Sequence, residues 1–392
     1  MKPKKPKHHK NDPSPQLESC GLQRRSFLEM LGNHCTIHGA VSFGSRHEKQ
    51  GTETLREKLA AVLTNYQPYF AGNPANVNPQ KMKELEQLLS DTSGVPTKFK
   101  IMSYDNWAYQ GFFALLNQLD GLSYGKKSLA MPKWVSLDCG MLPSGFVGFT
   151  APACHCPWSL LEKFDLPQNY VQDDCSMHDF APVPVSEFCC IPTAQKGTWI
   201  GHTLASISNG KNLGLLSKII GLALFDVETY FGVAQWNNTS LMTHTKIADL
   251  EIVCATSPAH SQPEETFVYT HAVPNDGKEL LAKFGMTPVV KKPDFYLNTA
   301  ESHTNKKKFV KVSLNASKTE TPFLGTLEIM QGQMTDELKY SIIYPGMVFE
   351  ENKEGTPSKY PFIPLKVYTK EKGRGKNYSE GCLGSCSRFK IS

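Results

Sequence analysis

The sequence predicts an α+β protein, in which a helical N-terminal region precedes a large, mainly antiparallel β domain that encloses a pocket. Two observations lead to this prediction. Apolar residues recur at helical spacing before about residue 125, and short β-branched or aromatic runs broken by Pro, Gly and Asn follow up to about residue 370. Helices followed by strands, without regular alternation, indicate α+β and not a doubly wound α/β sheet.

The chain has 392 residues and 40% of them are hydrophobic, so it can bury a sizeable core. Changes in composition along the chain predict four segments. They are a disordered basic tail at 1–16, a helical region at 17–125, a β-rich pocket domain at 126–370 and a second basic tail at 371–392.

The predicted helices of the first region have recognisable starts. An apolar stripe over 55–66 follows Thr54 and Glu57, which stand at the spacing of a capping box. Asn78 and Pro79 supply an N-cap and a first-turn proline for the next helix. Further helices are expected at 17–31 and 105–119.

The β-rich segment is a series of short strands, which two helices at 213–229 and 277–284 interrupt. The first of these helices is the longest apolar segment of the chain, but it contains Lys218 and is shorter than the roughly 20 residues of a membrane span. We therefore expect a soluble protein without a membrane span. The expected strands are 134–137, 146–150, 183–191, 198–207, 231–236, 250–255, 266–271, 309–314, 323–330, 340–344 and 364–368.

The formal net charge of +5 is concentrated in the two tails, because the first ten residues alone contain five lysines. Such tails can make weak contacts with nucleic acid or another anionic surface, although we favour solvated ends. The eleven cysteines are an odd number, and no apolar run follows the basic start or Arg24 and Arg25. These features predict reduced thiols and a cytoplasmic location. The oligomeric state is left open.

A cluster of cysteine and histidine between residues 154 and 190 is the sharpest chemical signal, because thiolate and imidazole bind zinc well. Cys189 and Cys190 are adjacent in a predicted strand, so their side chains should point to opposite faces and pack as small hydrophobic residues. A zinc-stabilised structural or interaction module built on Cys154–Cys190 is the alternative function. Its candidate ligands are Cys154, Cys156, Cys175 and His178.

Other catalytic motifs are few. The sequence has no Gly-x-Ser-x-Gly elbow, no Gly-x-Gly-x-x-Gly and no P-loop. We therefore expect no nucleotide and no cofactor, with zinc as the exception. Cys139 is a candidate nucleophile, but a buried or turn cysteine is the interpretation that we prefer.

Polar residues set among apolar strands between residues 199 and 271 predict a small-molecule pocket. Glu187 and His202 are assigned acid and base roles, because they are expected on neighbouring strands before a turn. The residues assigned to ligand binding are Gln235, Trp236, His244 and Lys246.

The order of features between about residues 150 and 350 resembles the acetoacetate decarboxylase-like superfamily. The matching motifs are Pro157-Trp158-Ser159-Leu160, Leu166-Pro167, Val185-Ser186-Glu187-Phe188, Gly197-Thr198-Trp199-Ile200-Gly201, the helix at 213–229 with Phe231-Gly232-Val233-Ala234-Gln235-Trp236, Lys292-Pro293-Asp294-Phe295-Tyr296-Leu297 and Gly325-Thr326-Leu327-Glu328.

The resemblance implies a decarboxylase-like lyase in which a lysine amine forms a Schiff base with the substrate. Ala234-Gln235-Trp236 contains no lysine at the corresponding place, and Lys246 lies ten residues further on without a second lysine. We therefore predict a small-molecule-binding protein, or a lyase or hydrolase that uses acid and base residues. Its ligand would be a small acyl or oxo-acid compound, held without a Schiff-base lysine.

Overall fold

All the residues that the computed structural model describes belong to one compact unit, Arg46–Ser392. The two basic tails, the helix expected at 17–31, and all four candidate zinc ligands lie outside the described residues. The described ranges are 54–103, 105–106, 110–125, 130–141, 143–152, 162–164, 182–207, 212–235, 238–256, 266–298, 303–304, 309–316, 324–330, 333–334, 338–349 and 362–369.

The fold is α+β, and its strands form one 15-stranded mixed sheet that is mainly antiparallel. The strands are β1 (Gln67–Gly72), β2 (Lys100–Ser103), β3 (Phe146–Pro152), β4 (Pro182–Pro192), β5 (Thr198–Ser206), β6 (Thr229–Gln235), β7 (Leu250–Thr256), β8 (Thr266–Ala272), β9 (Phe295–Asn298), β10 (His303–Thr304), β11 (Phe309–Ala316), β12 (Leu324–Met330), β13 (Gln333–Met334), β14 (Leu338–Ile342) and β15 (Phe362–Thr369).

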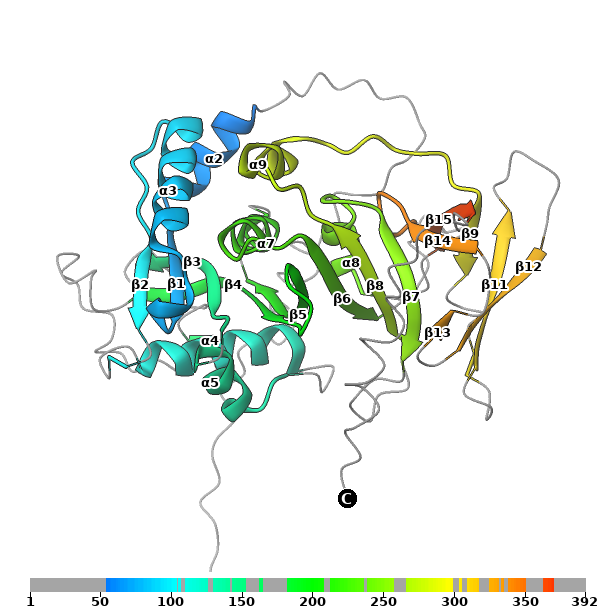
Figure 1. Cartoon of the computed structure of the whole chain (residues 1–392), viewed down its shortest axis with the longest axis horizontal. Coiled ribbons are helices and arrows are strands. Elements are labelled where there is room, and N and C mark those ends of the chain that lie inside the picture. The colour runs from blue at the N-terminus through cyan, green and yellow to red at the C-terminus, as the bar shows by residue number, and fades with distance from the viewer. Residues whose placement is uncertain are drawn as a thin grey trace, which may run out of the picture. The chain divides into compact units, whose positions relative to one another are not determined.

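The spatial order of the sheet is β13-β12-β11-β9-β15-β14-β7-β8-β6-β5-β4-β3-β1-β2, with β10 beside β11 (Figure 1). The pairs β1/β2 and β5/β6 are parallel. The described helices are α2 (Leu55–Leu63), α3 (Pro79–Ser93), α4 (Gln110–Tyr124), α5 (Lys133–Met141), α7 (Leu213–Leu224), α8 (Ser240–His244) and α9 (Gly277–Gly285), with short 3-10 turns at Pro74–Asn76 and Glu162–Phe164.

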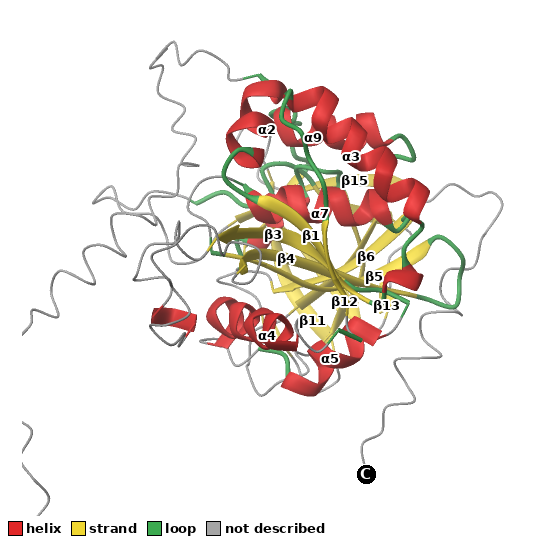
Figure 2. Cartoon of the chain, turned by 90° about the vertical axis from the view of Figure 1, so that its left-hand side faces the viewer, coloured by secondary structure: helices red, strands yellow, loops and turns green. Residues whose placement is uncertain are grey.

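Helices cover both faces of the β1–β6 part of the sheet (Figure 2). On one face α4 contacts β4 and β5, and α5 contacts β1. On the other face α7 contacts β3, β4 and β5, and α9, α2 and α3 pack around it. Each of these strands can therefore bury side chains on both of its sides.

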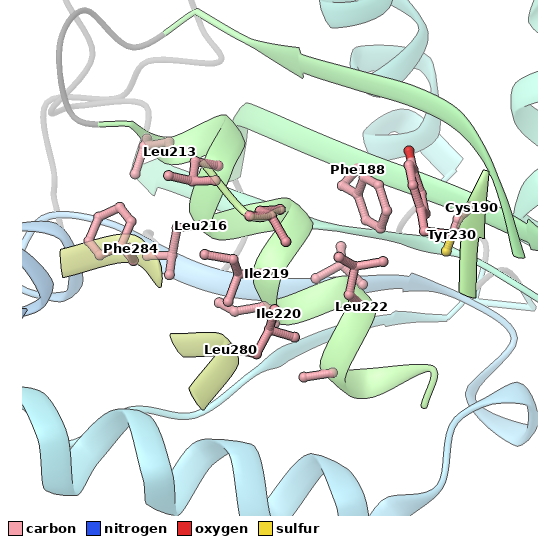
Figure 3. Close-up of a cluster of buried hydrophobic side chains, with 14 of the residues drawn as sticks. Phe188, Cys190, Leu213, Leu216, Ile219, Ile220, Leu222, Tyr230, Leu280 and Phe284 are labelled. Carbon is pink, nitrogen blue, oxygen red and sulfur yellow. The ribbon is translucent and has the colours of Figure 1, made fainter. Parts of the chain in front are cut away.

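Helix α7 forms the centre of the larger hydrophobic core (Figure 3). Its residues from Leu215 to Leu224 are all buried, which explains why its sequence is apolar all round and not amphipathic. Phe188 and Tyr230 pack on it from the sheet, and Leu280 and Phe284 pack on it from α9. A smaller core lies between the sheet and α4 and includes Tyr69, Phe112, Phe113 and Phe146.

The expected helix starts at Thr54 and Asn78 are confirmed. The Thr54 backbone N–H donates to Glu57 Oε2 at 2.7 Å, and the Glu57 backbone N–H donates to Thr54 Oγ1 at 3.3 Å, which completes the capping box of α2. Asn78 Oδ1 accepts hydrogen bonds from the N–H groups of Gln80 and Lys81 at the start of α3.

Two expectations for secondary structure are wrong. Residues 134–137 are not a strand but part of helix α5, because a short apolar run cannot be assigned by periodicity alone. The described part of region 17–125 is not purely helical, because β1 and β2 lie in it and join the main sheet. Pro68 lies within β1, opposite Phe149 of β3.

Smaller differences concern element ends. The helix expected at 213–229 ends at Leu224, and Thr229 already begins β6. In the described part of the chain, no helix has the length and apolar character needed to cross a membrane.

Candidate functional site

Glu187 and His202, the residues predicted to act as acid and base, lie on neighbouring antiparallel strands, β4 and β5. The register explains how they come to the same side of the sheet. Cys189 pairs with Thr203 and Cys190 pairs with Gly201, so His202 is the extra residue of a β-bulge. Such a bulge redirects a side chain out of the regular alternation, and bulges are common beside active sites.

Cys139, which is buried near the end of α5, is hydrogen-bonded to both Cys189 and His202. The hydrogen bond from the Cys189 thiol, with the hydrogen bond and positive charge of His202, lowers the pKa of Cys139 to about 5 although burial opposes this shift. A thiol with this pKa is a thiolate at neutral pH, and the thiolate is the nucleophilic form of cysteine.

His202 has the complementary shift. Desolvation works against the charged ring, but the hydrogen bond and negative charge of Cys139 and the charge of Asp120 raise the pKa of His202 overall. The side chain of His202 is also exposed, unlike that of Cys139. These shifts favour the thiolate form of Cys139 and the imidazolium form of His202, and the exposed ring of His202 can exchange a proton with solvent or a ligand.

Two buried carboxyl groups lie beside this pair, and Thr203 connects them. Thr203 Oγ1 lies 3.0 Å from Asp120 Oδ1 and 3.5 Å from Glu187 Oε1. The Met131 backbone N–H donates to Asp120 Oδ2 at 2.5 Å. Burial raises the pKa of Asp120, and burial together with the charge of Asp120 raises the pKa of Glu187 well above its ordinary value. Among the described residues, no hydrogen-bond partner reaches Glu187 Oε2.

This cluster of Cys139, His202, Glu187 and Asp120 stands where β5 and β6 part. The two parallel strands pair only from Thr198–Thr229 to Ile200–Phe231, although β5 continues to Ser206 and β6 to Gln235. In sheets with parallel strands, ligands bind at the carboxyl ends of strands that a crossover connects. Ile200 is the last residue of β5 that pairs with β6. Gly201 follows it, and His202 and Thr203 are the next two residues of β5.

Two of the predicted binding residues lie toward the carboxyl ends of these strands. Gln235 is the last residue of β6 and is buried. Lys246 Nζ donates to Asn212 Oδ1 at 3.3 Å, which places its ammonium beside the N-cap residue of α7. A lysine next to the positive end of a helix dipole favours an anionic ligand group. Trp236 lies outside the described residues.

His244 does not join this group, because it lies in a second buried polar cluster around Lys218. Lys218 Nζ is 3.1 Å from His244 Nδ1, 3.4 Å from His271 Nε2 and 3.9 Å from the centre of the Tyr230 ring. Burial lowers the pKa of Lys218 and of His244 well below their ordinary values, and it lowers that of His271 to about 3. The His271 ring is therefore neutral at pH 7, and burial favours the neutral forms of Lys218 and His244.

Sequence reasoning missed Asp120 and Lys218 and set Cys139 aside. Lys218 does leave a signal, since it is the one charged residue of α7, whose other positions apart from Ser217 are apolar or glycine. Such a lysine must be buried, and burial changes its pKa. Cys139 carries a weaker signal, because its role depends on α5 being a helix and on contacts with two distant strands.

The described residues contain no group of three or more His, Cys, Asp or Glu that could hold a metal ion. They do form a surface hollow, but it lies between α2, α3 and β1 and includes Tyr66, Lys83, Gln87 and Gly94. None of the predicted site residues lines this hollow.

No model of a known protein family matches the chain, and no curated protein matches it. A search of solved structures finds a protein from Desulfovibrio desulfuricans that is named as an acetyltransferase of the GNAT family. It is 12% identical, with 42% of this chain and 94% of that chain covered, at a TM-score of 0.27. A protein from Staphylococcus epidermidis, also named as an acetyltransferase, is 12% identical, with 53% and 98% covered, at a TM-score of 0.24. At these TM-scores neither likeness carries an argument about the fold or the function.

Proposed function

We propose that this chain is an enzyme that acts on a small acyl ligand, with Cys139 as the nucleophile and His202 as its acid–base partner. The observation that carries the proposal is the hydrogen-bonded Cys139–His202 pair, which lies where β5 and β6 separate. A thiolate held beside an imidazolium is the arrangement that cysteine-dependent acyl transfer requires.

The reaction has two steps. The Cys139 sulfur attacks the carbonyl carbon of the ligand, and the bond to the leaving group breaks while His202 gives its proton to that group. A thioester on Cys139 results. In the second step the neutral His202 takes a proton from water or another acceptor, which attacks the thioester and releases the Cys139 thiolate.

Glu187 supports this chemistry as an uncharged acid. Burial and the charge of Asp120 raise its pKa and so favour the protonated carboxyl, and its Oε2 has no partner among the described residues. A buried protonated carboxyl can donate a hydrogen bond to an oxygen that gains negative charge during the reaction. In this proposal Glu187 acts as a hydrogen-bond-donating acid, and His202 takes both acid and base roles.

The ligand class follows from the groups near the carboxyl ends of β5 and β6. Lys246 and the start of α7 favour an anionic group, as in an oxo acid or an acyl compound with a carboxylate or phosphate. The enclosed pocket of the β domain and the role of Gln235 remain parts of this proposal. The resemblance to the acetoacetate decarboxylase-like superfamily stays a prediction, and this mechanism needs no Schiff base.

Intact-mass spectrometry after treatment with p-nitrophenyl acetate tests the proposal. We expect one acetyl group, about 42 Da, on Cys139, formed together with a burst of p-nitrophenolate. Cys139→Ser should lose the burst and His202→Gln should slow it, whereas Cys190→Ser should keep it. Cys190 is the matched control because it lies on the opposite face of the sheet. Unchanged acetylation kinetics in Cys139→Ser would contradict the proposal.

A further inference from the structure

Cys139 and Cys189 come from different elements, α5 and β4, but their thiols meet in the smaller hydrophobic core. Both residues are buried, and they share that core with Tyr69, Phe112 and Phe146. Each sulfur is a hydrogen-bond partner of the other, and both cysteines are free thiols. The pair is therefore arranged for a reaction between the two sulfur atoms.

The two sulfurs differ in character. His202 stabilises the negative charge on Cys139, so this sulfur is the better nucleophile. Cys189 donates its proton to Cys139, and this hydrogen bond and burial raise the pKa of Cys189 well above its ordinary value. An anionic thiolate beside a protonated thiol is the arrangement of an attacking and a resolving cysteine.

We infer that Cys139 and Cys189 form a dithiol that a hydroperoxide oxidises to a disulfide. This is a site of oxidative modification, and it is distinct from acyl chemistry. Only its effect on activity, the loss of the nucleophile, rests on the proposed function. The formation of the cross-link does not.

The oxidation proceeds in two balanced steps. The Cys139 thiolate attacks the terminal oxygen of the hydroperoxide, the O–O bond breaks, and Cys139 becomes a sulfenic acid. The alkoxide or hydroxide that leaves takes the proton of His202. The Cys189 sulfur then attacks the Cys139 sulfur, and the S–O bond breaks as hydroxide leaves with the Cys189 proton as water. Two thiols are oxidised and one peroxide is reduced.

Cys190 provides a matched control within the same strand. It is buried like Cys189 but faces α7, where Phe188 and Tyr230 surround it (Figure 3). It is not a hydrogen-bond partner of Cys139, and burial raises its pKa. Cys190 should therefore take no part in the oxidation.

The experiment treats the full chain with hydrogen peroxide, alkylates the remaining thiols, and maps disulfides by peptide mass without reduction. We expect a cross-linked Cys139–Cys189 peptide about 2 Da lighter than the sum of its reduced parts, which dithiothreitol separates again. Cys190→Ser should give the same cross-link. In the Cys189→Ser variant, oxidation of Cys139 should stop at the sulfenic acid, which dimedone traps.

Absence of the Cys139–Cys189 peptide from oxidised, folded wild-type protein would overturn the inference, as would pairing of Cys139 with a different cysteine. This readout needs no variant to fold, and it is independent of acyl transfer. A cross-link without acetylation of Cys139 would support the inference and contradict the proposed function. Acetylation of Cys139 without a cross-link would overturn the inference and support the proposed function.

Discussion

At the residue scale, the chemistry of the site depends on which of its acids are charged. The pKa shifts favour a charged Cys139–His202 pair, whereas burial and the charge of Asp120 favour the protonated form of Glu187. Ionisation of Glu187 as well would place a second negative charge beside the Cys139 thiolate. When Glu187 is neutral, it adds no negative charge beside Cys139, and the imidazolium of His202 balances the charge of the thiolate.

The charge state of Glu187 predicts a pH dependence of stability. In the unfolded chain this carboxyl loses its proton near pH 4.5, whereas the folded protein keeps it well above that pH. The folded state then binds more protons, so wild-type stability attributable to Glu187 is present below pH 4.5 and is lost as pH rises. The wild-type unfolding free energy should fall relative to that of Glu187→Gln by about 1.4 kcal/mol per pH unit until the folded pKa is reached.

Urea unfolding of both proteins between pH 4.5 and pH 7 measures this difference. Glu57→Gln is the control, because Glu57 is an exposed residue in the first turn of α2 and hydrogen bonds with Thr54 lower its pKa. Its stabilising effect is already present above pH 4.5, where this carboxyl is ionised in both states, so the difference between wild type and Glu57→Gln should stay nearly flat over this range. A flat difference for Glu187 would mean that this carboxyl is ionised in the folded protein.

Sequence reasoning could place Glu187 and His202 together because adjacent strands and alternation are local properties. It could not show that His202 occupies a bulge, since the register of β4 against β5 depends on packing across both faces. Cys139 was set aside in favour of a buried or turn cysteine, because the sequence alone pairs no histidine with it. Only helix α5 and its packing bring that thiol to Cys189 and His202.

At the element scale, β5 is fitted closely to β6 just before the two strands separate. A Cβ atom on Gly201 would collide with the hydroxyl and ring of Tyr230 on β6. Gly201 also pairs with Cys190, at the edge of the bulge that carries His202. This glycine therefore allows both the close approach of Tyr230 and the bulge.

Gly201→Ala should destabilise the protein by about 1–3 kcal/mol, because the Tyr230 ring is buried and cannot easily move. Gly214→Ala on α7 is the control, since its nearest neighbour, Ser206, lies at an ordinary 3.4 Å. Alanine is the better helix former, so this control should be neutral or more stable by up to about 1 kcal/mol. Equal denaturation midpoints for Gly201→Ala and wild type would contradict the close packing.

At the scale of the whole molecule, the sheet separates two buried polar clusters. Cys139 and Cys189 lie in the core on the side of α4 and α5, and Glu187 lies near Cys139, whereas Cys190 and Lys218 lie on the side of α7. The expectation that Cys189 and Cys190 point to opposite faces is confirmed. Function is proposed for the first cluster because His202 connects it to solvent.

Most strands of the sheet were predicted from local runs of β-branched and aromatic residues, but their spatial order was not. β14 lies between β7 and β15, and β9 lies between β15 and β11, so the pairs join segments that are far apart in the chain. Short strands such as β2 and β13 give no local signal of their own. Their pairing depends on long-range contacts, which a single sequence does not specify.

The most direct test of the account is the rate at which iodoacetamide alkylates Cys139 between pH 4 and pH 10, followed by peptide mass on the folded protein. We predict a midpoint near pH 5 for wild type, with a shift toward the ordinary value of 9.0 in His202→Gln. A wild-type midpoint near 9.0 that His202→Gln leaves unchanged would contradict the thiolate–imidazolium pair and the function proposed for it.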